Sequence, residues 1–369
     1  IQTLPTTRLR ISKDTAINAF NHNAFKYDRK GISPILFFNF ADRLHVGLAY
    51  KTLKHKWRRN PFAYQHRFAV HYSINQGAFN ILYAGIVNEF VGKWNLQLNA
   101  HYDFVRWTNF FGIGNETDEF VDDRDYYRMR TRDALANIGL TRRLGGHSAL
   151  FINGFFQSID VIHDQERFLS KEFSIADKKM YDRKNFSGAE FRYTYQHLND
   201  MVVPTKGAEF SAGIRYTQNL QQKERSVTRY EATFNFFVPV LKRLVLAVRN
   251  GAATLSGEPE FYQLNPIGGS FTLRGYRRDR FWGKTAVYNS NELQWLFDFK
   301  SRLFNGKAGV VGLVDNGRVW QPGEESQIWH TAVGGGILLA PFNKLAVTIT
   351  YAKAPKDAQI NLRIGRSFK

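Results

Sequence analysis

Apolar and polar residues alternate with a period of two along several segments, and this alternation constrains the fold more than any other feature of the sequence. In a β-strand, successive side chains point to opposite faces, so such a segment has one apolar face and one polar face. The clearest example runs from Trp94 to Phe104, where Trp94, Leu96, Leu98, Ala100, Tyr102 and Phe104 alternate with Asn95, Gln97, Asn99, His101 and Asp103.

Sixteen segments have strand character, and they are too many and too long for an ordinary β-sandwich. A closed barrel, apolar outside and polar inside, accommodates them. We therefore predict an all-β fold: a transmembrane antiparallel β-barrel of about 16 strands over residues 31–369, preceded by a linker or plug segment at residues 1–30. The expected strands lie near residues 31–40, 44–53, 62–74, 78–90, 94–106, 125–143, 148–163, 184–198, 206–219, 225–239, 242–254, 285–299, 307–316, 328–340, 343–353 and 358–368.

The connections between these segments alternate in length. Long connections lie at residues 108–124, 165–183 and 255–284, and each of them follows an odd-numbered strand. Tight turns lie between other pairs of strands, for example at residues 91–93 and 145–147. Outer-membrane barrels have long extracellular loops and short periplasmic turns. The pattern therefore predicts a bacterial outer-membrane location, with the N-terminus in the periplasm.

Composition excludes other classes of protein. No apolar run approaches the roughly 18–20 residues of a membrane helix. The aromatic fraction of 15% suits a barrel with two aromatic girdles. The net charge of +19 comes from Lys and Arg residues dispersed along the chain, which does not indicate a nucleic-acid partner. We expect these residues to face the lumen and the anionic lipid and lipopolysaccharide head groups.

Several short motifs resemble those of the BamA and TamA superfamily. Residues 268–276 read GGSFTLRGY in the longest connection, where the family has its VRGF/Y loop signature. Residues 312–317 read GLVDNG on the thirteenth strand, where the family has a short Asp-containing motif. Residues 204–207 resemble a PxxG turn, and residues 110–115 read FFGIGN, similar to a loop of bacterial surface antigens. The resemblance is most specific over residues 184–369.

Strand parity shows where one acidic residue points. Glu292 alternates with Leu293 and Trp295, so it points into the lumen. The resemblance implies that the sixth extracellular loop folds into the lumen, where Arg274 bonds to Asp315 with Glu292 nearby. A guanidinium group can form a two-pronged bond with a carboxylate. The alternative is an exposed Arg-Gly turn without a partner.

Three further residues belong to the same predicted structural motif in the lumen. Gly275 permits a close approach of the loop backbone, and Tyr276 is expected to pack on the barrel wall. Gly317 ends the motif of the thirteenth strand.

The first and last strands are expected to meet at a lateral seam. In the family this seam can part to admit substrate strands, and a sheet edge pairs readily with an incoming strand. The alternative is a permanently closed seam that only completes the barrel. The last strand ends in an aromatic residue followed by Lys369, similar to the C-terminal signal of assembled barrels. The predicted seam residues are Leu36, Phe38, Ile360, Leu362, Ile364 and Phe368.

No catalytic motif is present in the sequence. It has no cysteine, no HExxH, no paired-His spacing, no GxSxG and no P-loop. We therefore predict no catalytic residue, metal or cofactor. One acidic cluster in the third external loop, at the connection of residues 108–124, could bind a divalent ion, but a solvated loop is the favoured interpretation; it consists of Glu116, Asp118, Glu119, Asp122, Asp123 and Asp125.

The resemblance implies a function. We expect the barrel to assist the insertion or translocation of polypeptides across the outer membrane, with substrate polypeptides and periplasmic or lipoprotein partners. The alternative is an anchor or export barrel for a fused N-terminal enzyme, such as a patatin-like lipase or a calcineurin-like phosphoesterase. A passive pore is disfavoured because a folded-in sixth loop would obstruct the lumen.

Overall fold

The computed structural model describes residues 27–39, 43–56, 59–123, 125–173, 178–300 and 305–368. The prediction of sixteen strands is confirmed: one antiparallel sheet contains sixteen strands in chain order. They are β1 (Arg29–Asn39), β2 (Arg43–Lys54), β3 (Tyr64–Ser73), β4 (Ala78–Val91), β5 (Trp94–Asn109), β6 (Arg128–Arg143), β7 (Ser148–Val161), β8 (Lys184–Leu198), β9 (Gly207–Asn219), β10 (Ser226–Leu241), β11 (Leu244–Gly257), β14 (Thr285–Lys300), β15 (Asn305–Trp320), β16 (His330–Pro341), β17 (Ala346–Lys353) and β18 (Ala358–Gly365).

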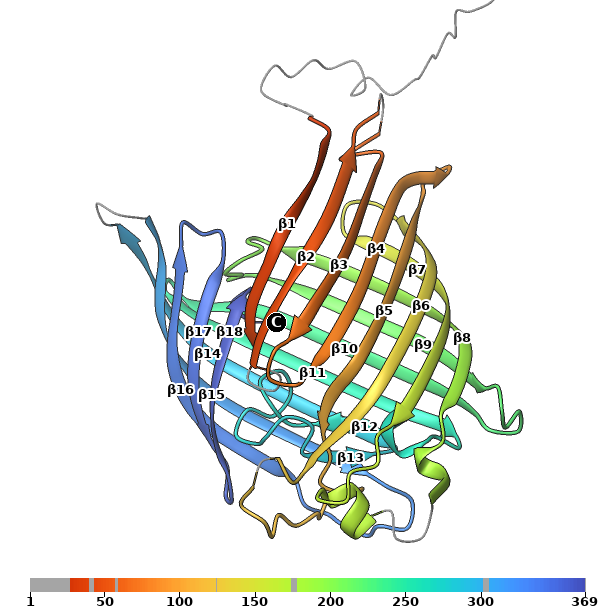
Figure 1. Cartoon of the computed structure of the whole chain (residues 1–369). Helices are drawn as coiled ribbons and strands as arrows, with labels where there is room; N and C mark the ends of the chain where they lie inside the picture. The colour runs from red at the N-terminus through yellow and green to blue at the C-terminus, as the bar shows by residue number, and fades with distance from the viewer. Residues whose placement is uncertain are drawn as a thin grey trace, which may run out of the picture.

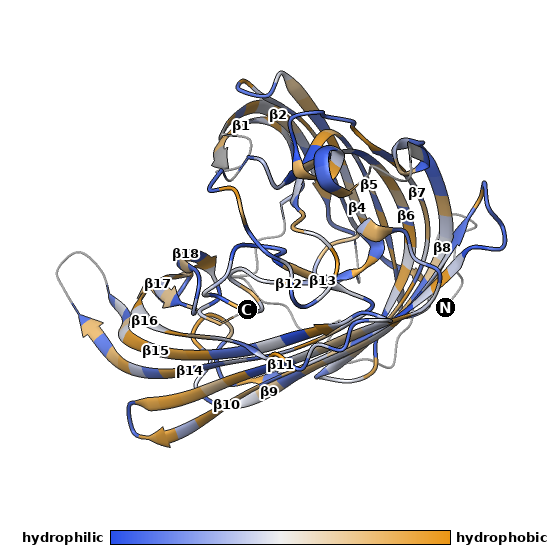
Figure 2. Cartoon of the chain, turned by 90° about the horizontal axis from the view of Figure 1, so that it is seen from below, coloured by the Kyte–Doolittle hydropathy of each residue, from blue (hydrophilic) through white to orange (hydrophobic). Residues whose placement is uncertain are grey.

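The sheet curls around a central lumen (Figures 1 and 2). Each strand pairs with its neighbours in sequence, apart from β12 and β13, which form a separate sheet. β1 and β18 are the two edges of the large sheet, and in the described part of the chain no ladder joins them. The predicted division at residue 30 stays a prediction, since residues 1–26 lie outside the described residues.

The long connections lie together at one end of the barrel (Figure 1). They carry η2 (Leu169–Phe173), η3 (Lys178–Tyr181), η4 (Phe261–Gln263) and the small sheet of β12 (Asn265–Ile267) and β13 (Phe281–Gly283). Buried aromatic and aliphatic side chains from these loops form one apolar cluster, which includes Phe110, Phe111, Tyr127, Phe168 and Trp282. None of the described helices is long and apolar enough to cross a membrane.

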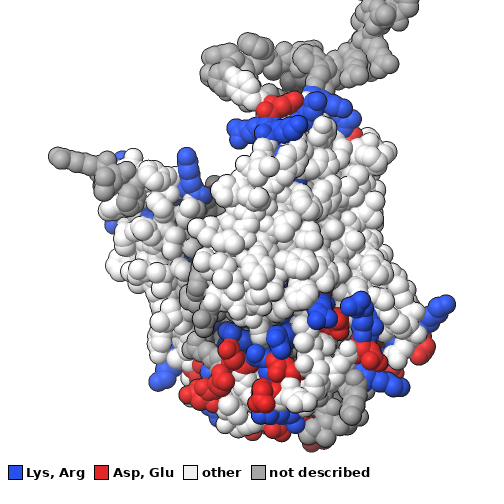
Figure 3. Space-filling model, in the orientation of Figure 1, with Lys and Arg blue, Asp and Glu red and all other residues white. Residues whose placement is uncertain are grey.

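The two faces of the sheet differ in polarity as predicted. On β14, Leu293 is 46% exposed and Trp295 is 60% exposed, whereas the alternating Glu292 and Gln294 are fully buried. The outer surface therefore carries the apolar set, and Figure 3 shows a broad band without charge between charged regions at both ends. This distribution is that of a transmembrane barrel.

The sixth loop, residues 258–284 between β11 and β14, folds into the curve of the sheet (Figure 2). Its β12–β13 hairpin lies inside the barrel beside β14 and β15. One reason is local: Gly317 leaves room at the wall, because a Cβ atom there would lie 3.1 Å from Ile267 Cδ1. The loop therefore reaches the strands that carry the predicted motif residues.

Candidate functional site

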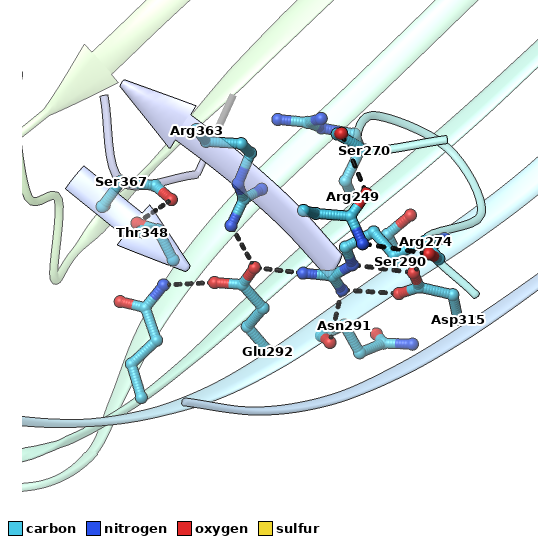
Figure 4. Close-up of polar contacts among 12 residues, drawn as sticks. Arg249, Ser270, Arg274, Ser290, Asn291, Glu292, Asp315, Thr348, Arg363 and Ser367 are labelled. Carbon is cyan, nitrogen blue, oxygen red and sulfur yellow. Dashed lines mark hydrogen bonds and ion pairs between the residues drawn. The ribbon is translucent and has the colours of Figure 1, made fainter. Parts of the chain in front are cut away.

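Arg274 of the sixth loop is bound in the lumen by two carboxylates (Figure 4). Its guanidinium forms a two-pronged contact with Asp315 on β15, with Nε 2.7 Å from Oδ2 and Nη2 2.5 Å from Oδ1. Its Nη1 donates to Glu292 on β14, and its backbone N–H donates to Asp315 Oδ2 at 3.0 Å. Arg274 is 1% exposed, and both carboxylates are fully buried. The structure therefore brings together the three charged residues predicted from the sequence.

Glu292 also binds the last strand. Arg363 of β18 donates through Nη2 to Glu292 Oε1 at 2.5 Å, and Gln294 donates to Glu292 Oε2 at 2.7 Å. The buried cluster thus has two guanidinium groups and two carboxylates, so its formal charge is balanced. Balance is needed because an unpaired buried charge is strongly unfavourable. Sequence reasoning did not select Arg363, although the alternation of residues 360–364 places it on the inner face.

Other side chains hold the backbone of the loop. Asn361 of β18 donates to Arg274 O at 3.0 Å, and Ser270 donates to Asn361 at 2.9 Å. Ser290 of β14 donates to Thr272 O at 2.7 Å. The loop is therefore fixed to β14 and to the edge strand β18.

The Gly-Tyr pair of the motif faces β16. A Cβ atom on Gly275 would lie 2.5 Å from the Ala332 side chain, so only glycine permits this approach. The Tyr276 ring packs edge-on against Phe281 at 5.3 Å and against His330 at 5.5 Å between ring centroids. These contacts position the backbone that carries Arg274.

The predicted seam residues lie in two different environments. Leu36 on β1 is 72% exposed, and Ile360, Leu362 and Ile364 on β18 are 50–75% exposed, so all four face outward beside a sheet edge. Phe38 belongs to β1, but its side chain lies outside the described part of the structure.

Phe368 requires a correction. The predicted last strand runs to residue 368, but β18 ends at Gly365, whose φ of +134° is one that other residues rarely adopt. The chain then turns into the lumen, where Phe368 is 1% exposed and packs edge-on against Phe237 of β10. Phe368 is therefore an interior residue and not a seam residue.

The acidic cluster of the third loop faces arginine and lysine side chains. Glu119 pairs with Arg277 of the sixth loop, and Asp118 lies 3.8 Å from Lys356. Burial raises the pKa of Glu119, and the charges of Arg277 and Arg280 oppose this shift. Among the described residues, no group of three His, Asp or Glu side chains is arranged to hold a metal ion.

The third loop comprises residues 110–127, between β5 and β6, and the seventh loop comprises residues 321–329, between β15 and β16. Hydrogen bonds of Asn115 join the third loop to the seventh. Asn115 is fully buried, and its amide donates to Ser326 Oγ at 2.9 Å and to Ile328 O at 2.7 Å. Its Oδ1 accepts from the Val319 N–H at 3.2 Å, and its backbone N–H donates to Glu324 at 2.7 Å. The third, sixth and seventh loops are therefore joined at the long-loop end of the barrel, an arrangement that we call the loop cap and that sequence reasoning did not predict.

Solved structures that share this architecture do so at low sequence identity. BamA from Haemophilus ducreyi lacking POTRA domains 1–3 superimposes with a TM-score of 0.65 at 16% identity, over 92% of this chain and 70% of that chain. CdiB from Escherichia coli gives a TM-score of 0.56 at 13% identity, over 91% of this chain and 62% of that chain. CdiB from Acinetobacter baumannii gives a TM-score of 0.52 at 12% identity, over 91% of this chain and 65% of that chain. The chain thus spans less than two thirds of either CdiB chain.

The family comparison covers most of the chain. Comparison with curated proteins gives no match. The family model described as the Omp85 superfamily domain matches residues 64–368, from β3 to the segment after β18. Barrels of this superfamily lie in the bacterial outer membrane. Since the match covers well over half of the sequence, the chain belongs to the Omp85 superfamily.

Proposed function

We propose that this barrel assists the insertion or translocation of polypeptides across the bacterial outer membrane. Membership of the Omp85 superfamily and the likeness to BamA and CdiB support this proposal. So does the position of the sixth loop, which fills part of the lumen and is unsuited to a passive pore.

One observation carries the proposal: the buried Glu292 binds both the sixth loop, through Arg274, and the edge strand β18, through Arg363. A sheet edge presents backbone N–H and C=O groups that can pair with an incoming strand. A movement of the sixth loop would therefore disturb the contacts of β18, the strand beside the seam. We propose that substrate strands engage the barrel at this seam.

The orientation and the partners follow from this function. We propose that the N-terminal side lies in the periplasm, that residues 1–30 form a linker or plug, and that residues 31–369 form the barrel. The long loops then face outward, where lipopolysaccharide surrounds them. Substrate polypeptides and periplasmic or lipoprotein partners would approach the short-turn end. This function needs no catalytic residue and no cofactor.

The test is an insertion assay in proteoliposomes. A small outer-membrane barrel, unfolded in urea, is diluted into liposomes with or without this protein, and its folding is followed by the heat-modifiable shift on gels. We expect severalfold faster folding in the presence of the protein. A barrel that serves only as the anchor of a fused enzyme would leave the rate equal to that of empty liposomes, which would contradict the proposal.

A further inference from the structure

Residues 366–368, which follow β18, leave the sheet and enter the lumen. If the alternation of β18 continued, Phe368 would face outward together with Ile360, Leu362 and Ile364. The chain instead turns at Gly365, and Ser367 and Phe368 become almost completely buried. An aromatic ring inside a largely polar lumen needs a specific receiving site.

That site binds the segment by three kinds of contact. Arg366 Nη1 lies 2.5 Å from Glu209 Oε1, and its Nε donates to Met201 O at 3.0 Å. The Ser367 N–H donates to Val202 O at 2.9 Å. The Phe368 ring packs against Phe237 with centroids 6.0 Å apart, and the Arg249 guanidinium lies 4.7 Å from it. We call this the tail site, formed by Met201, Val202, Glu209, Phe237 and Arg249.

The tail site lies at the short-turn end of the lumen. Met201 and Val202 belong to the turn between β8 and β9, which is separated from β18 by many strands of the sheet. Around Phe368, an apolar cluster joins this turn and β10 to strands β14–β17, with Val203, Phe237, Val245, Leu296, Val311 and Leu338. Residues 366–368 therefore bridge the lumen where a polypeptide would enter from the short-turn side.

The contacts of the segment can be exchanged without disrupting the sheet. The ladder between β17 and β18 ends at Gly365, so release of residues 366–368 breaks no strand pairing. The site recognises one cation, one backbone N–H and one aromatic ring two residues after the cation. Any extended polypeptide with an arginine at one position and an aromatic residue two positions later offers the same groups.

We propose that the tail site is a peptide-binding site, that residues 366–368 occupy it when no substrate is present, and that a polypeptide segment with the pattern Arg-x-aromatic displaces them. This inference rests on the proposed function, because it treats the occupied site as an autoinhibitory contact at the entrance for substrate. A bound segment would form a charge-assisted ion pair with Glu209 and an aromatic contact with Phe237.

The test measures binding of a fluorescent peptide with the sequence of residues 362–369 to the barrel in detergent micelles, by fluorescence polarisation. The receiving proteins are the unmodified chain and a released variant, Arg366→Gln with Phe368→Ala. Arg366→Gln alone serves as the milder variant if the double change prevents folding. Empty micelles control for partition of the peptide.

Two further substitutions test the role of Glu209, each introduced into the released variant. Glu209→Gln removes the carboxylate of the tail site. Glu231→Gln is the matched control, because Glu231 pairs with Arg192 elsewhere in the lumen.

We expect the released variant to bind the peptide about tenfold more tightly than the unmodified chain, since one charge-assisted pair and one ring contact no longer compete. Glu209→Gln should weaken this binding, and Glu231→Gln should not. A peptide with alanine in place of the phenylalanine should bind weakly. Equal binding to the released and unmodified chains, or to both peptides, would show that residues 366–368 are permanent packing. The insertion assay is independent, so failure here leaves the proposed function separately testable.

Discussion

At the scale of single residues, the buried cluster around Arg274 joins the sixth loop to β14, β15 and β18. The sequence indicates a partner for Arg274 only through its resemblance to a family, because Asp315 lies 41 positions away. Parity alone shows that Glu292 points inward. Neither signal reveals that Arg363 shares Glu292, since the two residues are 71 positions apart and lie on strands that do not pair with each other.

The first prediction concerns this cluster. Arg274→Ala leaves the buried Asp315 without its partner, and Asp315→Ala leaves the Arg274 guanidinium with Glu292 alone, at a cost of up to about 3–5 kcal/mol to the local stability of the sixth loop. Each variant should increase protease cleavage between residues 258 and 284, and the double variant should be little worse than either single one. Arg278→Ala, on the same loop but 76% exposed, is the control and should change little. Additive effects of the two changes would contradict the proposed coupling.

At the scale of elements, the alternation of polarity predicted the strands well because lipid and lumen impose opposite demands on neighbouring residues. The expected ends differ from the observed ends by a few residues, as for β15, expected at 307–316 and found at Asn305–Trp320. The loop cap could not be predicted. Its contacts join residues such as Asn109 and Arg278, which are 169 positions apart and carry no shared periodic pattern.

The second prediction tests that cap. Asn115→Ala removes three side-chain hydrogen bonds to the seventh loop and the end of β15, with a local cost of about 1–3 kcal/mol for the groups left unpaired. Limited proteolysis should then cut residues 110–127 faster than in the unmodified chain. Asp122→Ala, on the same loop with a fully exposed side chain, should leave the cutting rate unchanged. A rate that does not change for Asn115→Ala would show that the cap is held elsewhere.

The third prediction tests the two faces of β5. Leu98→Cys should react with a thiol reagent that partitions into lipid, because its side chain is expected on the outer face. Asn99→Cys should react with a small aqueous reagent, because residue 99 shares its face with His101, which lines the polar lumen cavity. Mass spectrometry after labelling in liposomes measures both reactions. The reverse preference would mean that the lipid-facing and lumen-facing sides of β5 are exchanged.

At the scale of the whole molecule, sixteen strands in chain order form a barrel whose edge strand is bound to the sixth loop from inside. The sequence predicts the number and order of strands, because each pairing is local. It does not predict the inward turn after β18, because Gly365 interrupts a regular alternation and the receiving residues lie more than 100 positions away. Contacts between residues that are distant in the sequence determine this inward turn.

The account is tested most directly by photocrosslinking during the insertion assay. A photoreactive amino acid replaces Leu36 on β1 or Leu362 on β18, and in the control it replaces Ile214, an outward residue of β9 that is 48% exposed and far from both sheet edges. If substrate strands engage the seam, the two edge positions should crosslink to the unfolded substrate and Ile214 should not. Equal crosslinking at Ile214, or none at either edge while insertion proceeds, would contradict the proposed role of the seam.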